Sequence, residues 1–390
     1  MARARSPLVV IFLTVFIDLV GFGIVIPVLP LYAERFGASP LVIGCLLGIY
    51  SLMQLVCAPL LGQLSDRIGR RPVLLVSLLG TAAGFFLMGV AHTLTLLFVA
   101  RIIDGVTGGN ISTALAYIAD VTPPEHRSRG MGIVGAAFGL GFVVGPALGG
   151  LMSHISLGAP FLCAGALATA NAVALWFFLP ESLPPERRHQ AHQRPSVWAI
   201  FREGDRRALT LTLATYFFTT VAFSLLTATY PLFTERRFGF GAIQNGYIFA
   251  CQGLLGAIIQ GGLLGWLVKQ SGERPLTIVG LALLTSGLFL LPMSVTTAVL
   301  FATTAAVAVG HGLVASTLNG LASKAVPGAA QGRVLGLMQS AASGARIVGP
   351  VLGGWLLGQD TTRVAETFGR TPYWTGGAIV AMAVLLALAL

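Results

Sequence analysis

Charged residues are scarce in this chain: aspartate, glutamate, lysine and arginine together make up 10% of its 390 residues. Soluble domains usually carry about a quarter charged residues, so this composition excludes an ordinary soluble globule. Hydrophobic residues reach 55% of the sequence, and the mean hydropathy is +0.84. We therefore expect an integral membrane protein.

Motifs of enzymes and metal proteins are also missing. The sequence contains no GxxxxGK[ST] nucleotide loop, no GxSxG and no HExxH. The four cysteines lie in apolar runs without the spacing of metal ligands, which argues against a zinc site or a disulfide framework. His189 and His192 are loosely spaced in a basic polar segment, where histidines are usually solvated. We expect neither an enzyme nor a resident cofactor or metal.

Long apolar runs fill most of the chain instead. Each is close to the roughly 17 to 25 residues that a helix needs to cross a bilayer. The runs cover residues 7–32, 41–61, 73–91, 94–120, 130–153, 159–179, 208–232, 243–267, 276–293, 297–323, 333–357 and 373–390. The sequence therefore predicts an all-α membrane protein with twelve transmembrane helices.

An internal repeat divides these spans into two sets of six. GQLSDRIGRRP at Gly62–Pro72 returns as GWLVKQSGERP at Gly265–Pro275, an offset of 203 residues, and both read as tight charged turns between spans. A run that starts at Arg129 and ends in GPALGG returns from Arg333, ending in GPVLGG, at an offset of 204. Because several positions keep one offset, we infer a duplication. The predicted halves are residues 1–180 and 208–390, joined by a hydrophilic linker at 181–207.

Arginine and lysine are distributed unevenly between the two sides of this predicted topology. Seventeen of the 24 lie at the N-terminus, in the linker and in the loops on the same side, five lie on the other side, and Arg101 and Arg346 lie within spans. Positive residues stay in the cytoplasm, so we expect both termini to be cytoplasmic in the inner membrane. The formal charge of +10 then reflects topology and contact with anionic lipid, without a nucleic-acid partner.

Three charged residues of the first half lie inside predicted spans. A charge at the centre of a bilayer costs about 2.5 to 3.5 kcal/mol on insertion scales, so such residues usually have a function. Arg101 and Asp104 are three residues apart and share one helix face. They form either a structural ion pair or a group in which Arg101 keeps nearby acids ionised until a proton or substrate shifts the balance.

Asp18 has no cationic residue within its own span. It is a candidate proton carrier, with a substrate counter-ion or a structural role as alternatives. His311 is the histidine that lies well inside a span; it either joins two helices by a hydrogen bond or takes part in proton coupling. The predicted coupling set is therefore Asp18, Arg101, Asp104 and His311.

Aromatic and hydrogen-bonding residues within the spans suit a cavity for an amphipathic molecule. The predicted cavity residues are Tyr50, Gln54, Phe218, Phe223, Asn245, Gln252, Gln339 and Arg346. Small residues and prolines in two corresponding spans predict closely packed helices that can bend. These packing residues are Gly141, Gly145, Pro146, Gly149, Gly150, Gly349 and Pro350.

Several of these motifs together resemble the major facilitator superfamily. GQLSDRIGRRP is similar to that family's signature loop between spans 2 and 3, Arg101 to its embedded arginine, and GLGFVVGPALGG to its drug:proton antiporter motif. FIDLVGFGIVIPVLP in span 1 resembles the bacterial tetracycline-efflux branch, although span 3 has Gly84 where that branch commonly has an acid. The resemblance implies a monomeric antiporter that exchanges protons for an amphipathic drug such as tetracycline. A proton-coupled importer and a non-transporting receptor or scaffold are the alternatives.

The resemblance also implies a conformational latch in the signature loop. Its members would be Gly62, Asp66, Arg67, Gly69, Arg70, Arg71 and Asp120. Arg70 would pair with Asp120, and the loop would dock near Arg333–Gly336. In the second copy Lys269, Gln270 and Glu273 stand opposite Asp66, Arg67 and Arg70. We therefore expect the two latches to differ in strength.

Overall fold

The structure is a computed structural model that describes residues 7–122, 127–184 and 197–390, and these residues contain helices but no β-strand. The chain forms two compact units. The first contains Met1–Gly37, Ile49–His192 and Ala242–Ala250, and the second contains Ala38–Gly48, Gln193–Gly241 and Cys251–Leu390. The predicted boundaries of the sequence halves stay a prediction, and residues 185–196 of the predicted linker lie outside the described residues.

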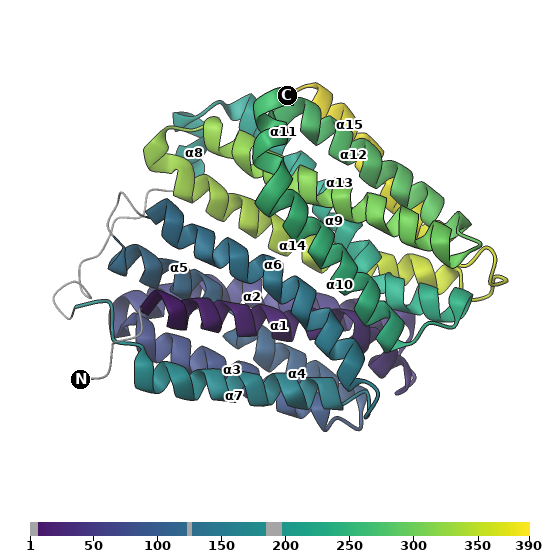
Figure 1. Cartoon of the computed structure of the whole chain (residues 1–390), viewed down its shortest axis with the longest axis horizontal. Coiled ribbons are helices and arrows are strands. Elements are labelled where there is room, and N and C mark those ends of the chain that lie inside the picture. Colours follow the sequence, from purple (N-terminus) through teal and green to yellow (C-terminus); the bar gives the residue numbers. More distant parts are fainter. Residues whose placement is uncertain (1–6, 123–126, 185–196) are drawn as a thin grey trace. The chain divides into compact units, whose positions relative to one another are not determined.

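The first half of the chain forms seven helices among the described residues (Figure 1). They are α1 (Pro7–Glu34), α2 (Pro40–Ile68), α3 (Arg70–Gly89), α4 (Leu94–Thr107), α5 (Asn110–Val121), α6 (Arg127–Met152) and α7 (Ala159–Phe178). Helices α4 and α5 form one span, Leu94–Val121, that is interrupted at Gly108 and Gly109. A core of apolar side chains from α1, α3, α5, α6 and α7, including Ile11, Leu74 and Tyr117, holds this part together.

The second half begins with a short helix, α8 (Val197–Glu203), inside the predicted linker. It continues with α9 (Arg206–Phe238), α10 (Ala242–Ile258), α11 (Leu264–Ser271), α12 (Glu273–Leu290), α13 (Thr297–Lys324), α14 (Gln331–Gln359) and α15 (Arg370–Leu388). A π-helical turn, η3 (Ile259–Leu263), joins α10 to α11, and the 3₁₀ turns η4 (Leu291–Met293) and η5 (Gly328–Ala330) follow α12 and precede α14.

Eleven spans of the described chain are long and apolar enough to cross a membrane. The remaining predicted span, residues 333–357, lies within α14, which is 29 residues long but more polar because it contains Gln331, Arg333, Gln339 and Arg346. Each of the twelve predicted spans overlaps one of these helices or helix pairs. The prediction of an all-α membrane fold is confirmed.

The same helix pairs pack in both halves of the chain, as the duplication predicts. In the first half α1 packs on α6, and α3 packs on α4 and α7; in the second, α9 packs on α14, and α12 packs on α13 and α15 (Figure 1). Glycines allow the closest of these contacts. A Cβ atom added to Gly145 on α6 would lie 2.6 Å from the carbonyl oxygen of Val20 on α1, and one added to Gly349 on α14 would lie 2.6 Å from that of Val221 on α9.

The signature stretch differs from its prediction as a turn. Helix α2 continues through Gly62 to Ile68, and Gly69 alone separates it from α3. Gly69 has φ 112°, and Gly272, at the 203-residue offset, has φ 79° between α11 and α12. Both values lie in the region that favours glycine because it lacks Cβ. The turn is this short because one such residue redirects the chain without further loop residues, so the prediction of a turn over Gly62–Pro72 is wrong in extent.

Candidate functional site

Asp18 of α1 meets the interruption of the fourth span. Asn110, the first residue of α5, is 2% exposed, and its Nδ2 donates to Asp18 Oδ1 over 2.9 Å. The break at Gly108 and Gly109 ends α4, so Asn110 starts a new helix beside α1. The partner of Asp18 is thus a neutral amide on another helix.

Arg101 and Asp104 form a buried ion pair on α4. Nη1 of Arg101 lies 2.9 Å from Asp104 Oδ2, and the side chains are only 2% and 6% exposed. The guanidinium also lies 4.3 Å from the ring centroid of Tyr50 on α2, a cation–π contact. Removing one member of such a pair leaves an unbalanced charge in a region that solvates it poorly.

Tyr50 and Gln54 connect α2 to the same place. Nε2 of Gln54 donates to the Tyr50 hydroxyl over 3.2 Å and to the carbonyl oxygen of Gly108 over 2.8 Å, so it satisfies a carbonyl that the helix break leaves open. Five residues predicted in two separate sets therefore lie together, and Asn110 joins them. We call these residues the polar cluster: Asp18, Tyr50, Gln54, Arg101, Asp104 and Asn110.

The polar cluster contains two carboxylates and one guanidinium. Asp104 pairs with Arg101, whereas no cationic side chain in the described part of the chain pairs with Asp18. The two acids are close enough to interact electrostatically. One more positive charge, from a proton or from a cationic group of a bound molecule, would balance the cluster. Such an arrangement can exchange a proton for a substrate.

Gly84 on α3 lies where the family resemblance would place an acid in the third span. A Cβ atom at this position would lie 3.0 Å from Cβ of Asp104 and 3.0 Å from the carbonyl oxygen of Ala100. The close contact between α3 and α4 therefore leaves little room for a side chain at position 84. Asp104 supplies a carboxylate beside that position from the neighbouring helix.

His311 lies in the second unit, on α13, and the polar cluster lies in the first. Its imidazole stacks on Phe223 of α9, with ring centroids 3.7 Å apart and planes 3° from parallel. Nδ1 of His311 and Nε2 of the buried Gln252 have no hydrogen-bond partner within the described residues. These atoms are available to a bound molecule or to water.

The other predicted cavity residues are dispersed. Asn245 is fully buried at the start of α10, Gln339 is exposed on α14, and Arg346 donates to Ser343 Oγ over 3.0 Å. Phe218 on α9 lines a cavity of about 840 Å³ in the second unit. Its lining includes the polar residues Arg202, Arg206 and Thr210 and the apolar residues Phe201, Phe217 and Leu337.

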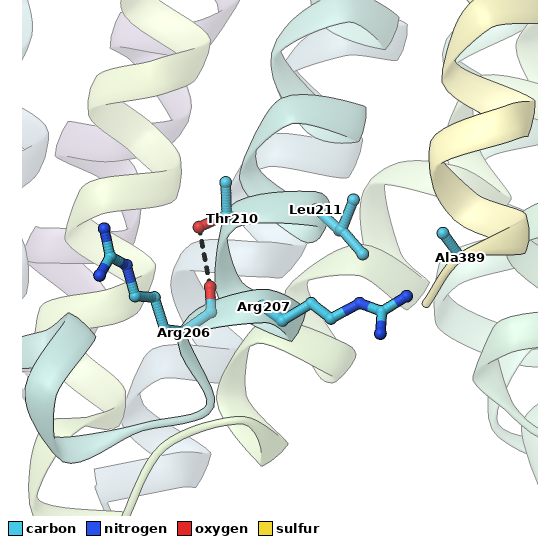
Figure 2. Close-up of a pocket in the computed structure, with 5 residues that line it drawn as sticks. All are labelled: Arg206, Arg207, Thr210, Leu211 and Ala389. Carbon is cyan, nitrogen blue, oxygen red and sulfur yellow. Dashed lines mark hydrogen bonds between the residues drawn. The ribbon is translucent and has the colours of Figure 1, made fainter.

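A smaller cavity of about 470 Å³ lies beside the N-terminal end of α9. Figure 2 shows its lining residues: Arg206, Arg207, Thr210, Leu211 and Ala389. The two arginine side chains extend to opposite sides of α9, and that of Arg207 points toward Ala389 (Figure 2). Arg206 therefore lines both cavities, whereas Arg207 lines only the smaller one.

Arg70 is the centre of the predicted latch. Its Nη1 lies 2.6 Å from Asp66 Oδ1 and 2.6 Å from Ser65 Oγ, and its Nε lies 3.2 Å from Asp120 Oδ2. The predicted partner Asp120, at the end of α5, is thus in contact. Arg67, another predicted member, is exposed and forms no ion pair with the described residues, so it lies outside this network. Arg71 donates to the carbonyl oxygen of Trp176.

Glu181 belongs to this network, and the sequence prediction did not include it. Its carboxylate accepts from the backbone N–H of Arg70 over 2.9 Å and from that of Arg71 over 3.2 Å. It therefore caps the first turn of α3, where a negative charge also meets the positive end of the helix dipole. An acid directly after the sixth span was the available signal.

The second copy of the latch carries the opposite charges. Glu273, which stands opposite Arg70, pairs with Lys324 over 2.9 Å. Lys324 stands opposite Asp120 at the 204-residue offset that the later repeat follows. The Lys324 side chain is 70% exposed, so this pair is a surface ion pair of about 0 to 1 kcal/mol. The pair survives the duplication while both of its signs are reversed.

The predicted packing residues lie mostly along α1. Gly141, Gly145 and Gly149 of α6 face Leu19, Val20 and Ile24, where each added Cβ would lie within 3.1 Å of an α1 atom. Gly150 instead faces Gly246 of α10, within the first unit. The carbonyl oxygen of Pro350 lies 2.2 Å from where a Cβ of Gly44 would be, within the second unit. Pro146 packs beside Gly23.

Comparisons with known proteins agree on one family. The sequence pattern of the Major Facilitator Superfamily matches residues 11–350 and 261–390. The tetracycline resistance protein, class C, of Escherichia coli is 36% identical over 354 residues, which cover 90% of this chain and 89% of that protein.

Solved structures resemble the chain over its whole length. The human organic anion transporter MFSD10 (TETRAN) superimposes with a TM-score of 0.73 at 26% identity, over 99% of this chain and 100% of that one. A bacterial homolog of the human lysosomal transporter Spinster has a TM-score of 0.83 at 15% identity, over 100% of this chain and 97% of that one. The second likeness concerns the fold alone.

Proposed function

This chain belongs to the major facilitator superfamily of membrane transporters, and on that premise we propose that it is an antiporter that exports an amphipathic drug such as tetracycline in exchange for protons. The similarity to the class C tetracycline resistance protein supports the substrate class. It does not favour the importer or the receptor as an alternative. Transport would proceed by alternating access, in which the site opens to one side of the membrane at a time.

One observation supports proton coupling above the others: the polar cluster holds two acids and one arginine. We propose that Asp18 carries the exchanged proton, while Arg101 keeps Asp104 paired. When the proton leaves Asp18, a polar or cationic group of the drug can take its place. Binding of proton and drug would then exclude each other, which is what an antiporter requires.

The available free energy suffices for such a pump. One proton that enters down a potential of 100 mV supplies about 2.3 kcal/mol, and each pH unit adds about 1.4 kcal/mol. The sum of about 3.7 kcal/mol corresponds to a gradient of roughly 500-fold for a neutral substrate. We propose that the chain holds no resident cofactor or metal and catalyses no reaction.

The orientation in the membrane, the oligomeric state and the role of the latch are further parts of this proposal. Both termini would lie in the cytoplasm of a cell with an inner membrane, because most basic residues lie on that side of the topology. The chain would act as a monomer in contact with lipid. The latch around Arg70 would hold one conformation of the transport cycle, with the Glu273–Lys324 pair as its weaker counterpart.

Growth on a panel of drugs tests this function. Cells that express the chain should tolerate a higher concentration of tetracycline than cells that lack it and than cells that express Asp18→Asn at the same level in the membrane. Equal sensitivity of cells with and without the chain to every compound in the panel would reject drug export. It would favour an importer or a receptor instead.

A further inference from the structure

The cavity of about 840 Å³ in the second unit is lined by two arginines and by aromatic side chains. On α9 its residues follow helical spacing: Arg206, Thr210, Leu213 and Phe217 are four, three and four residues apart and share one face. The 11 helical steps from Arg206 to Phe217 span about 16 Å at 1.5 Å per residue. This length suits a drug-sized molecule with a polar head and a flat apolar body.

The two arginines of the cavity lining form no ion pair with acids in the described part of the chain. Glu203 pairs with Arg333, and Asp205 accepts hydrogen bonds from the backbone N–H groups of Arg207 and Ala208. In the described part of the chain no carboxylate lies within ion-pair distance of Arg202 or Arg206. Two guanidinium groups can bind an acidic group with paired hydrogen bonds.

The wall of the cavity complements an apolar ring system. Phe217 and Phe218 contact each other edge to face, with ring centroids 5.7 Å apart and planes at 76°. Leu337 and Ala341 of α14, four residues apart, supply the opposite wall. Aromatic and aliphatic side chains around a few polar groups are typical of small-molecule sites.

We propose that this cavity is an entry site for amphipathic organic acids, with Arg202 and Arg206 binding the acidic group and Phe217 and Phe218 packing on the apolar body. The proposal rests on the proposed function for the direction of transport: if the linker is cytoplasmic, the cavity lies on the side from which an exporter takes up its substrate. The entry site would select substrates that carry a negative charge, and the polar cluster provides no such selection.

Two dyes with the same ring system and opposite charge test the proposal. Fluorescein is an anion, and a rhodamine ester with the same xanthene ring is a cation. Purified protein in vesicles of zwitterionic phosphatidylcholine is titrated with each dye, and binding is followed by fluorescence anisotropy. The variants are Arg202→Gln with Arg206→Gln, the charge-conserving Arg202→Lys with Arg206→Lys, and the control Arg207→Gln, whose side chain extends to the other side of α9 (Figure 2).

We expect the double glutamine variant to weaken fluorescein binding at least tenfold and to leave binding of the cationic dye unchanged. The double lysine variant should keep part of the affinity, because it keeps the charge but loses the paired hydrogen bonds, and Arg207→Gln should keep all of it. Unchanged fluorescein binding in the double glutamine variant would overturn the proposal. An equal loss for both dyes would also overturn it, because the arginines would then have a structural role.

A lipid headgroup offers the same acidic chemistry, so the titration is repeated in vesicles that contain anionic phosphatidylglycerol. If the cavity binds substrate, fluorescein affinity should remain within a factor of two to three once surface-charge repulsion is corrected with the Arg207→Gln control. If fluorescein binding is lost in these vesicles, and the loss occurs only in protein that has both arginines, lipid occupies the cavity. That result would overturn the proposal. Dye binding without transport of any drug would refute the proposed function and leave this site intact.

Discussion

Replacing Arg70 by lysine separates the geometry of the latch from its charge. Arg70 contacts Asp66 and Ser65 through Nη1 and Asp120 through Nε. A lysine has a single ammonium group at the end of a flexible chain, so it cannot reproduce this fork. Arg70→Lys should therefore keep the positive charge but lose the contact with either Asp66 or Asp120.

The expected magnitude follows from the lost contact. A hydrogen bond that involves a charged group contributes about 1.5 to 3 kcal/mol. The conformation that the latch stabilises should then be populated about 10 to 150 times less, because each 1.4 kcal/mol is a factor of ten. If that conformation limits the cycle, the transport rate falls by a similar factor.

The assay is the initial rate of tetracycline uptake into everted membrane vesicles, divided by the amount of transporter in the membrane. Arg67→Lys is the matched control, because Arg67 lies three residues earlier and is exposed. Arg67→Lys should transport at nearly the wild-type rate. Similar rates for the two lysine variants would refute the latch geometry.

Three further predictions concern the latch, the ion pair and the packing. Asp66→Asn should slow transport while equilibrium drug binding to purified protein stays largely intact; a large loss of affinity would contradict this. Arg101→Gln should lower the thermal unfolding midpoint more than Arg101→Gln combined with Asp104→Asn, because breaking a buried pair from one side costs about 3 to 5 kcal/mol; the reverse order would show that the pair is not a unit. Gly145→Ala should destabilise the protein by about 1 to 3 kcal/mol, whereas Gly135→Ala on the same helix, with open space at its Cβ position, should not; equal unfolding midpoints would count against the packing.

The sequence was sufficient to predict the helices and their duplication. Apolar runs of membrane length are local features, and the repeated offset of 203 to 204 residues relates the two halves without knowledge of any contact. The length of the turn at Gly62–Pro72 was overestimated, because a cluster of charged residues between apolar runs is typical of a loop. Here Asp66 and Arg70 lie on consecutive helical turns across Gly69 and pair with each other.

The contacts of the site were predictable where they are local. Arg101 and Asp104 are three residues apart, so helical geometry alone places them together. Asn110 is 92 residues from Asp18, and Glu181 is 111 residues from Arg70, so neither contact follows from spacing. Lys324 could have been found, because it stands opposite Asp120 at the 204-residue offset of the second repeat.

Proton-coupled export through Asp18 is the central claim, and one experiment in proteoliposomes tests it most directly. Purified wild-type protein and Asp18→Asn are reconstituted at equal density, a pH gradient is imposed, and tetracycline accumulation and proton movement are recorded together. The wild type should accumulate drug against its gradient and move protons in the opposite direction, with about a tenfold change in the attainable gradient per pH unit for each proton. Asp18→Asn should do neither, although it unfolds at a similar temperature. Drug accumulation by Asp18→Asn that follows the pH gradient as in the wild type would contradict the account.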